Sequence, residues 1–264
     1  MRRTALPPGA FAAMGTIVSV RPGLGAVRRG PAGAAPGGAD PVEHVRAVFA
    51  RWEARCSLFD PESELSRVGR GELSLVDAGA EVRHAYALAL QWRDATGGRF
   101  TPHRGDGLVD LNGVVKALAV QEAGEELDHL GRPGWAIDAG GDLLVADEAR
   151  VAVGIVDPAD RSGLLGRIDL DGVRRRAVAT SGSAERGDHI WTAPGVERTP
   201  FVQVTVAAGD LLTADVLATA IVAGGHPALD ELARRHDVDV LAVEHDGALL
   251  ATPGWPRAAA AGTS

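Results

Sequence analysis

The stretch from residue 110 to residue 142 constrains the fold most, because it joins a helical pattern to a hairpin signal. Its apolar residues recur at steps of three and four, which predicts an amphipathic helix entered through Asn112-Gly113: Val115, Ala119, Val120, Ala123, Leu127 and Leu130. A turn at residues 131–134 and a strand at 135–137 follow. The sequence DAGGD at 138–142 is then typical of a two-residue Gly-Gly hairpin. Two acids beside paired glycines also allow a ligand to approach the backbone closely.

The same stretch holds the one lysine of the chain, Lys116, and the one asparagine, Asn112. The other 26 of the 27 Lys plus Arg residues are arginine, so Lys116 is expected where a compact ammonium is needed and a guanidinium fork does not fit. We expect it in the first turn of the helix, where a cation opposes the helix dipole. An anion such as a phosphate at this helix end would remove the conflict. A surface lysine that extends its ammonium into water is the alternative.

Composition excludes several classes of protein. The 264 residues are 45% hydrophobic and 23% charged, which is typical of a globular protein, and the net charge of −8 argues against broad nucleic-acid binding. Cys56 is the only cysteine, so neither an intramolecular disulfide nor a cysteine zinc cluster is expected. No signal-peptide pattern and no run of about 18 apolar residues is found, so we expect a cytoplasmic protein without membrane insertion.

Several further elements have clear signals. Residues 14–20 indicate a strand, and Asp40-Pro41 predicts the start of a helix. Asp171-Gly172 predicts a hairpin between strands at 167–170 and 176–179. Residues 180–183, TSGS, place hydroxyls around a glycine, which suits phosphate oxygens or a routine turn. His189 is a candidate for proton transfer, with a structural histidine as the alternative.

A possible metal site lies on a later helix. Thr213 is expected to cap a helix over residues 214–223, in which Asp215 and Thr219 are four residues apart and therefore lie on one side. Two hard oxygens presented together suit Mg²⁺, which takes few protein ligands. The alternative is an acid that complements the helix dipole beside an unremarkable threonine. Hairpin strands mixed with separate helices predict a single α+β domain with a mainly antiparallel sheet and packed helices.

Eight short segments occur in a recognisable order along the chain. They are MGT at 14–16, SLFDPESELS at 57–66, TGGRF at 96–100, DLNGVVK at 110–116, AGGD at 139–142, VGIVDP at 153–158, ATSG at 179–182 with ERGDHI at 185–190, and ADVLATA at 214–220. In this order they resemble the ApbE-type FAD:protein FMN transferases. The resemblance implies a T-fold-like α+β domain over residues 11–252. Composition adds two further predictions: a flexible Gly/Ala/Pro-rich loop at 21–39 within the domain, and a disordered Ala-rich tail at 253–264.

The resemblance also implies a reaction and its partners. Such an enzyme binds FAD and Mg²⁺ and transfers the FMN moiety onto a threonine or serine of an acceptor flavoprotein, releasing AMP. By the resemblance, the metal is held by Asp215, Thr219 and the carbonyl of Val115, and the catalytic residues are Lys116, His189 and Asp215. Flavin contacts fall on the following residues: Met14, Gly113, Lys116, Gly140, Gly141, Asp142, Thr180, Ser181 and Gly182.

Three departures from the family pattern keep other functions open. The family's FDP reads Phe100-Thr101-Pro102 here, the segment before DLNGVVK is short, and the aspartate that usually follows His189-Ile190 is missing. A Mg²⁺-dependent FAD pyrophosphatase, in which water replaces the acceptor hydroxyl, is one alternative. A non-catalytic FAD-binding protein is the other. The acceptor and the oligomeric state are not indicated by the sequence.

Overall fold

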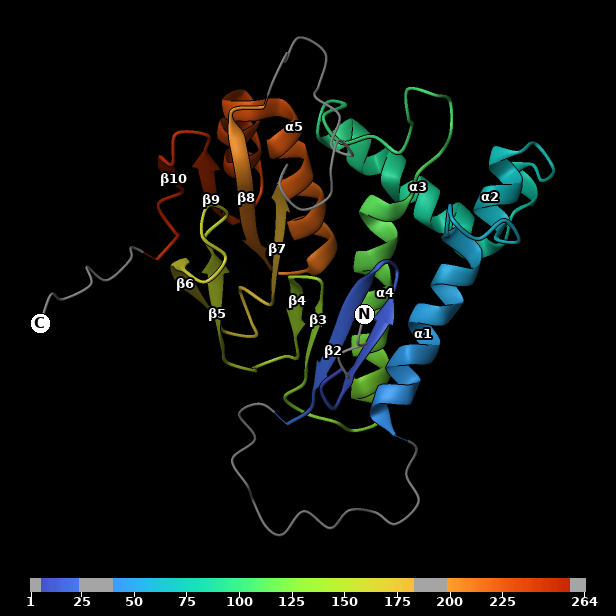
Figure 1. Cartoon of the computed structure of the whole chain (residues 1–264), viewed down its shortest axis with the longest axis horizontal. Coiled ribbons are helices and arrows are strands. Elements are labelled where there is room, and N and C mark those ends of the chain that lie inside the picture. Colours follow the sequence, from blue (N-terminus) through green and yellow to red (C-terminus); the bar gives the residue numbers. More distant parts are fainter. Residues whose placement is uncertain (1–5, 24–39, 183–198, 257–264) are drawn as a thin grey trace, which may run out of the picture.

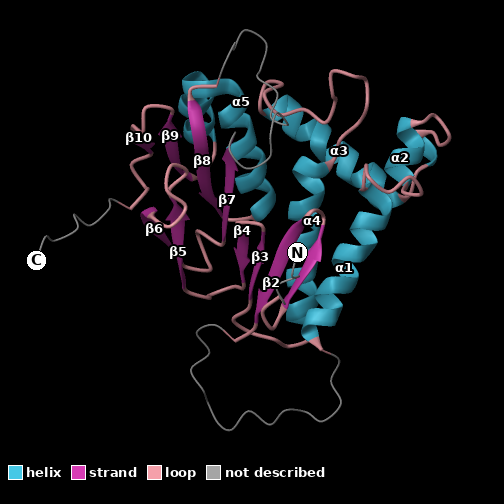
Figure 2. Ribbon diagram, in the orientation of Figure 1, coloured by secondary structure: helices cyan, strands magenta, loops and turns pink. Residues whose placement is uncertain are grey.

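A computed structural model of the chain describes residues 6–23, 40–182 and 199–256. Its main feature is an eight-stranded sheet in the order β1-β2-β3-β4-β7-β8-β9-β10, in which every neighbouring pair is antiparallel (Figures 1 and 2). Strands β5 and β6 form a separate two-stranded sheet. The strands are β1 Ala10–Ala13, β2 Thr16–Arg21, β3 Ala136–Ala139, β4 Asp142–Val145, β5 Val151–Val156, β6 Leu164–Leu170, β7 Ala177–Gly182, β8 Phe201–Ala208, β9 Asp239–Glu244 and β10 Leu249–Ala251.

Two long helices, α4 and α5, pack against each other and against the centre of the large sheet. Helix α4 contacts β3 and β4, whereas α5 contacts β7 and β8 (Figure 1). Helices α1 and α3 pack on α4. The helices are α1 Pro41–Cys56, α2 Glu64–Gly69, α3 Ala80–Ala95, α4 Asn112–His129 and α5 Leu211–Arg235, with a short 3₁₀ turn at Leu75–Asp77. The predicted α+β class with a mainly antiparallel sheet is therefore confirmed.

The paired glycines form the predicted tight hairpin. Ala139 lies opposite Asp142 across β3 and β4, so Gly140 and Gly141 are the two turn residues, and both have positive φ angles, 69° and 92°. Positive φ at both positions is what a two-residue hairpin with the native strand twist requires. The Asp138 carboxylate accepts a hydrogen bond from the Gly141 amide at 3.0 Å. This turn makes Asp142 the first residue of β4.

Helix α4 begins where the sequence pattern predicts, but Lys116 lies one step deeper than expected. Asn112 is the first helical residue, so Lys116 is the fifth and lies in the second turn, not in the first. The reason is that Leu111, which has no side-chain capping bond, occupies the cap position directly before Asn112. The ammonium consequently faces the sheet, where Lys116 is buried with 6% of its surface exposed.

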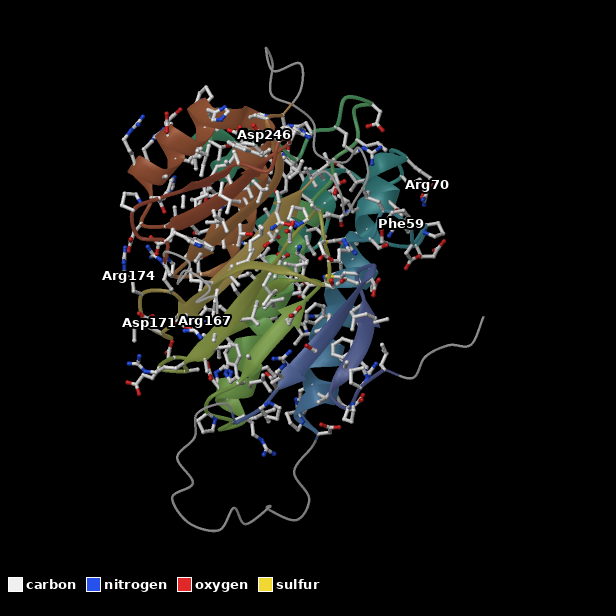
Figure 3. All side chains as sticks on the ribbon, turned by 60° about the vertical axis from the view of Figure 1, so that its left-hand side comes forward. Phe59, Arg70, Arg167, Asp171, Arg174 and Asp246 are labelled. Atoms are coloured by element: carbon white, nitrogen blue, oxygen red, sulfur yellow. The ribbon has the colours of Figure 1, made fainter. Side chains whose placement is uncertain are left out.

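The strands beside Asp171-Gly172 do not form the predicted hairpin. Strand β6 pairs with β5, and β7 pairs with β4 and β8, so the connection carries the chain from the small sheet into the large one. The Asp171 carboxylate accepts bonds from the Val173 and Arg175 amides, each at 2.9 Å, and therefore closes a turn without pairing the flanking strands. Asp171 and Arg174 lie on the side of the molecule away from the exposed Phe59 and Arg70 (Figure 3).

Helix α5 is longer than predicted, and its cap is different. Asp210 occupies the cap position and accepts a hydrogen bond from the Thr213 amide at 2.8 Å, so Thr213 is inside the helix rather than its cap. Gly225 has a φ of 64°, which kinks the helix before Pro227. In the part of the chain that the structure describes, α5 is the one helix long and apolar enough to cross a membrane by length and composition. Of its most apolar window, 78% is buried inside the protein, as in a core helix.

The expected loop at 21–39 and tail at 253–264 fall largely outside the described residues. Arg21 is the last residue of β2, and residues 22–23 follow it. At the other end, Trp255 is buried with 7% of its surface exposed. The domain limits remain predictions.

Candidate active site

Three charged side chains, one each from α4, β4 and α5, meet where the two helices pack on the large sheet. The Lys116 ammonium from α4 forms an ion pair with Oδ2 of Asp142 from β4, and Oδ2 of Asp215 from α5 is 3.5 Å from the same nitrogen. The three side chains are nearly fully buried, with exposed fractions of 6% for Lys116, 0% for Asp142 and 5% for Asp215. Lys116 is therefore not the surface lysine of the alternative interpretation.

A backbone amide and a hydroxyl of strand β7 contact the residues around this charged cluster. The Thr180 amide donates to Oδ1 of Asp142 at 3.1 Å. The Ser181 hydroxyl is 3.0 Å from the Thr219 hydroxyl of α5, one helical turn after Asp215. Residues far apart in the sequence thus form one polar cluster: Lys116, Asp142, Thr180, Ser181, Asp215 and Thr219. All six were candidates from the sequence.

Thr205 belongs to the same cluster and was not predicted. Its hydroxyl is 2.9 Å from that of Thr180, and its side chain is fully buried on β8. A signal for it exists in the sequence. In FVQVTV the threonine interrupts a buried apolar strand, and a buried hydroxyl needs a hydrogen-bonding partner.

The donor set fits a hard divalent cation. Of the charged groups in these contacts, two are carboxylates and one is an ammonium, so together they carry one negative charge when all are ionised. A net negative charge inside a protein favours a nearby cation. Asp215 and the Thr219 hydroxyl are hard oxygen donors, and Val115, whose carbonyl is the third candidate ligand, directly precedes Lys116. Among residues 6–23, 40–182 and 199–256, this cluster included, no group of three or more His, Cys, Asp or Glu gathers that could hold a metal ion, so the candidate set is two side chains and one carbonyl.

The turns that hold Met14 and Gly140 lie at the same end of the sheet, because β2 pairs with β3. Met14 and Gly15 form the two-residue turn between β1 and β2, with Ala13 opposite Thr16 and positive φ angles of 49° and 70°. The Met14 amide donates to Oε1 of Glu53 at 3.1 Å, a contact that was not predicted. The Gly140 amide donates to the Ile17 carbonyl at 3.1 Å, and a Cβ on Gly140 would lie 2.2 Å from Oγ1 of Thr16.

Packing within the protein explains two of the other candidate glycines. A Cβ at Gly113 would lie 2.7 Å from the Phe100 ring, and a Cβ at Gly182 would lie 2.7 Å from the Val202 carbonyl. Gly141 differs, because a Cβ there would meet no atom within 4 Å. The remaining candidate, His189, lies outside the described residues.

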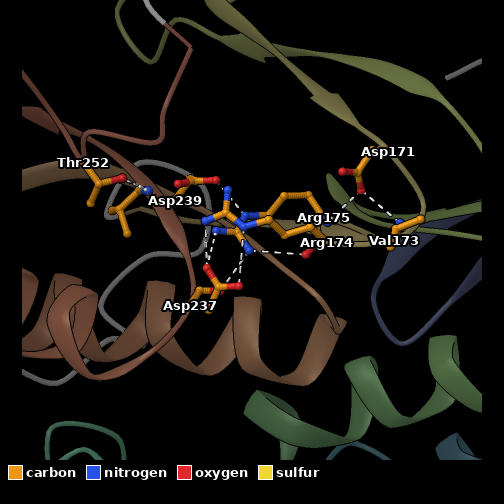
Figure 4. Close-up of polar contacts among 8 residues, drawn as sticks. Asp171, Val173, Arg174, Arg175, Asp237, Asp239 and Thr252 are labelled. Carbon is orange, nitrogen blue, oxygen red and sulfur yellow. Dashed lines mark hydrogen bonds and ion pairs between the residues drawn. The ribbon is translucent and has the colours of Figure 1, made fainter.

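A second polar network lies away from the cluster. Arg175 and Asp239 form a buried ion pair of 2.6 Å, and Arg174 and Arg175 both contact Asp237 (Figure 4). The two arginines lower the pKa of the Asp237 carboxyl. A cavity of about 650 Å³ adjoins this network between the end of α5 and β9–β10, and none of the candidate residues lines it.

The family model and the similar solved structures all point to one family, ApbE. The model of the ApbE family matches residues 103–242. The solved ApbE protein of Thermotoga maritima is 19% identical, with a TM-score of 0.71 and coverage of 92% of this chain and 96% of that one. The flavin transferase ApbE of Vibrio cholerae is 17% identical, with a TM-score of 0.67 and coverage of 92% of this chain and 95% of that one. The flavinyl transferase ApbE of Pseudomonas stutzeri, in its apo form, is 20% identical, with a TM-score of 0.71 and coverage of 92% of each chain. No curated protein matches the sequence. At these identities the solved structures show a common fold.

Proposed function

This chain belongs to the ApbE family, and from that premise we propose that it is a Mg²⁺-dependent FAD:protein FMN transferase. Its substrates are FAD and an acceptor protein with a threonine or serine hydroxyl. The observation that supports this best is the buried cluster of Lys116, Asp142 and Asp215 beside the Ser181 and Thr219 hydroxyls. Residence in the cytoplasm is part of the same proposal.

The reaction transfers a phosphoryl-linked flavin between two oxygen atoms. The acceptor hydroxyl oxygen attacks the phosphorus on the FMN side of the FAD pyrophosphate, the bond to the bridging oxygen breaks, and AMP leaves with that oxygen. The hydroxyl proton is lost to a base or to solvent. Such transfers depend on positioning and on stabilising negative charge at the phosphoryl oxygens.

The chain's own residues suit these tasks. The Lys116 ammonium, which is buried and paired with Asp142 of β4, would stabilise negative charge on a pyrophosphate oxygen with little solvent to screen it. Asp215, Thr219 and the Val115 carbonyl would hold Mg²⁺, which supplies Lewis-acid neutralisation of the pyrophosphate when bound. His189 remains a candidate for the group that accepts the proton.

The test is to incubate the purified protein with FAD and Mg²⁺, with and without a flavinylation-acceptor domain, and to quantify AMP and the acceptor mass. We expect AMP together with a flavinylated acceptor, both lost on chelation. Asp215→Asn and Thr219→Val should lower the rate by more than about 100-fold, because even indirect partners of metal ligands contribute roughly 10–100-fold. Asp239→Asn, which also removes a buried carboxylate charge but lies in the other network, is the matched control: it lowers stability, yet the fraction that circular dichroism shows to be folded should retain the rate.

Two outcomes would replace the proposal. AMP and FMN formed without an acceptor would indicate the FAD pyrophosphatase. Bound FAD without AMP in the presence of Mg²⁺ would indicate the binding protein. An Asp215→Asn variant with unchanged activity would reject the metal assignment alone.

A further inference from the structure

We propose that Asp142 is a positioning residue, which orients the Lys116 ammonium and fixes the end of β7, and that it is not a flavin contact. The proposal concerns a residue for which family resemblance implies a contact with FAD. Its consequence for catalysis rests on the proposed function, whereas its structural part does not.

The Asp142 carboxylate is fully buried. Asp142 has no exposed surface, and each of its carboxylate oxygens contacts a group of the protein, one by a hydrogen bond and one by an ion pair. Oδ1 accepts from the Thr180 amide at 3.1 Å, and Oδ2 forms the ion pair with Lys116. Because none of its surface is accessible, this carboxylate could accept a flavin hydroxyl only if the groups packed around it moved away.

The strand pairing explains why an aspartate is needed here. The backbone pairs of β4 with β7 are Leu144 with Ala177 and Leu143 with Val178, and they stop there. Beyond that point the Asp142 side chain accepts a hydrogen bond from the Thr180 amide, and this bond continues the link between the two strands. The carboxylate thereby holds the part of β7 that presents Thr180 and Ser181.

The position of Lys116 gives Asp142 its second task. The ammonium lies between two carboxylates and contacts Asp142 more closely than Asp215, from which it is 3.5 Å away. A lysine stem has four rotatable bonds, so without Asp142 the ammonium would move onto Asp215. Asp142 therefore holds the ammonium near β4 and keeps it from a closer contact with Asp215.

The single lysine makes a direct test possible. Protein grown with isotopically labelled lysine gives side-chain NMR signals from Lys116 alone, in the full chain and without any ligand. We expect Asp142→Asn, which keeps an acceptor for Thr180 but removes the charge, to shift these signals and to speed the exchange of the ammonium protons by more than about tenfold. Asp239→Asn removes an equally buried carboxylate charge and should leave them unchanged. Unchanged Lys116 signals in Asp142→Asn would overturn the proposal.

Binding and turnover separate positioning from flavin contact. A positioning role predicts that Asp142→Asn transfers flavin with a kcat at least about tenfold lower, and that any rise in the Kd for FAD accompanies shifted Lys116 signals. A Kd raised more than tenfold with unmoved lysine signals would mean a direct flavin contact and would reject the proposal. Where Asp142→Asn does not fold, Asp142→Ser, which is neutral and smaller, serves in its place. A wild-type protein without transferase activity would reject the proposed function only, because the lysine signals still decide whether Asp142 positions Lys116.

Discussion

At position 116, the surroundings of the side chain give a physical reason for lysine rather than arginine. Its side chain is buried between Asp142 and Asp215, and this space holds a single ammonium. We predict that Lys116→Arg lowers the transfer rate at least tenfold and destabilises the fold by about 1–3 kcal/mol, because a larger planar group overpacks the site. Denaturant unfolding and the AMP assay would measure both effects.

The control for this prediction is the reverse change on the surface. Arg167→Lys alters a side chain that is 68% exposed and pairs with Asp169 at the surface. Its stability should change by less than about 0.5 kcal/mol. A Lys116→Arg protein with wild-type stability and rate would show that any positive charge suffices at position 116.

Cys56 is predicted to be chemically inert in the folded protein. Its side chain is 2% exposed, and burial, followed by the nearby Glu64 and Glu81, raises the pKa of the thiol to about 12. Because only the thiolate reacts with alkylating agents, iodoacetamide at about pH 8 should label the native protein far more slowly than the unfolded protein. Mass spectrometry would follow a single modification, since the chain has one cysteine. Equal labelling rates with and without denaturant would contradict the burial.

Helix α4 shows how an element's packing can reverse a local preference. Gly124 lies inside this helix, where alanine is intrinsically better by about 1 kcal/mol. A Cβ at this position would lie 2.4 Å from the Trp135 ring, whose indole nitrogen also donates to Asp128 at 2.6 Å. We predict that Gly124→Ala is nevertheless destabilising by about 1–2 kcal/mol, because overpacking outweighs propensity. Chemical unfolding monitored by circular dichroism would measure it.

Gly166 in β6 provides the comparison for Gly124. A Cβ at Gly166 would meet no atom within 4 Å, and this glycine does not have a positive φ angle. Gly166→Ala should therefore be neutral or slightly stabilising, through the entropy of the unfolded chain. A Gly124→Ala variant as stable as Gly166→Ala would mean that Trp135 moves without cost.

Local signals predicted the elements whose structure depends on local contacts. The helix over Asn112–His129, the Gly140-Gly141 hairpin and the Asp40 cap are all found, because each depends on residues a few positions apart. The pairing of β6 was missed for the opposite reason. Asp171-Gly172 makes a turn, but contacts with residues much later in the chain, such as the pair of Arg175 with Asp239, carry β7 to the other sheet.

The candidate site was predictable as a set of residue types but not as an arrangement. Lys116, Asp215 and Thr219 were selected from their rarity or spacing, and the structure brings them together. The full burial of Asp142 depends on how β4 and β7 meet, which a single sequence does not contain. Thr205 is marked in the sequence only as a hydroxyl in an apolar strand, and its partner Thr180 is 25 residues away. Glu53 contacts Met14 over a separation of 39 residues, for which no sequence spacing gives a signal.

At the scale of the whole molecule, the pair of Arg175 with Asp239 ties the β6–β7 connection to β9. Both side chains are about 95% buried, and Arg175 also contacts the exposed Asp237. Asp239→Asn removes the buried partner and leaves Arg175 with the exposed Asp237 alone, so it should cost about 3 kcal/mol of unfolding free energy. Arg174→Gln changes only the exposed contact with Asp237 and should cost less than about 1 kcal/mol. Similar midpoints for the two variants in denaturant would show that burial adds nothing here.

The stability of the molecule should also depend on pH through His236, the residue that ends α5. Burial, with a further contribution from Arg235, lowers the pKa of this imidazole below its usual value, and its ring lies 5.7 Å from that of Trp92. The unfolded chain then binds a proton at this site more readily than the folded chain, so stability falls as the pH falls through the unfolded value of about 6.5. We predict that unfolding midpoints measured between about pH 7.5 and pH 5.5 decrease less steeply in His236→Gln than in the wild type. Parallel pH profiles for the two proteins would mean that His236 titrates alike in the folded and unfolded states, and that burial against Trp92 does not penalise its charge.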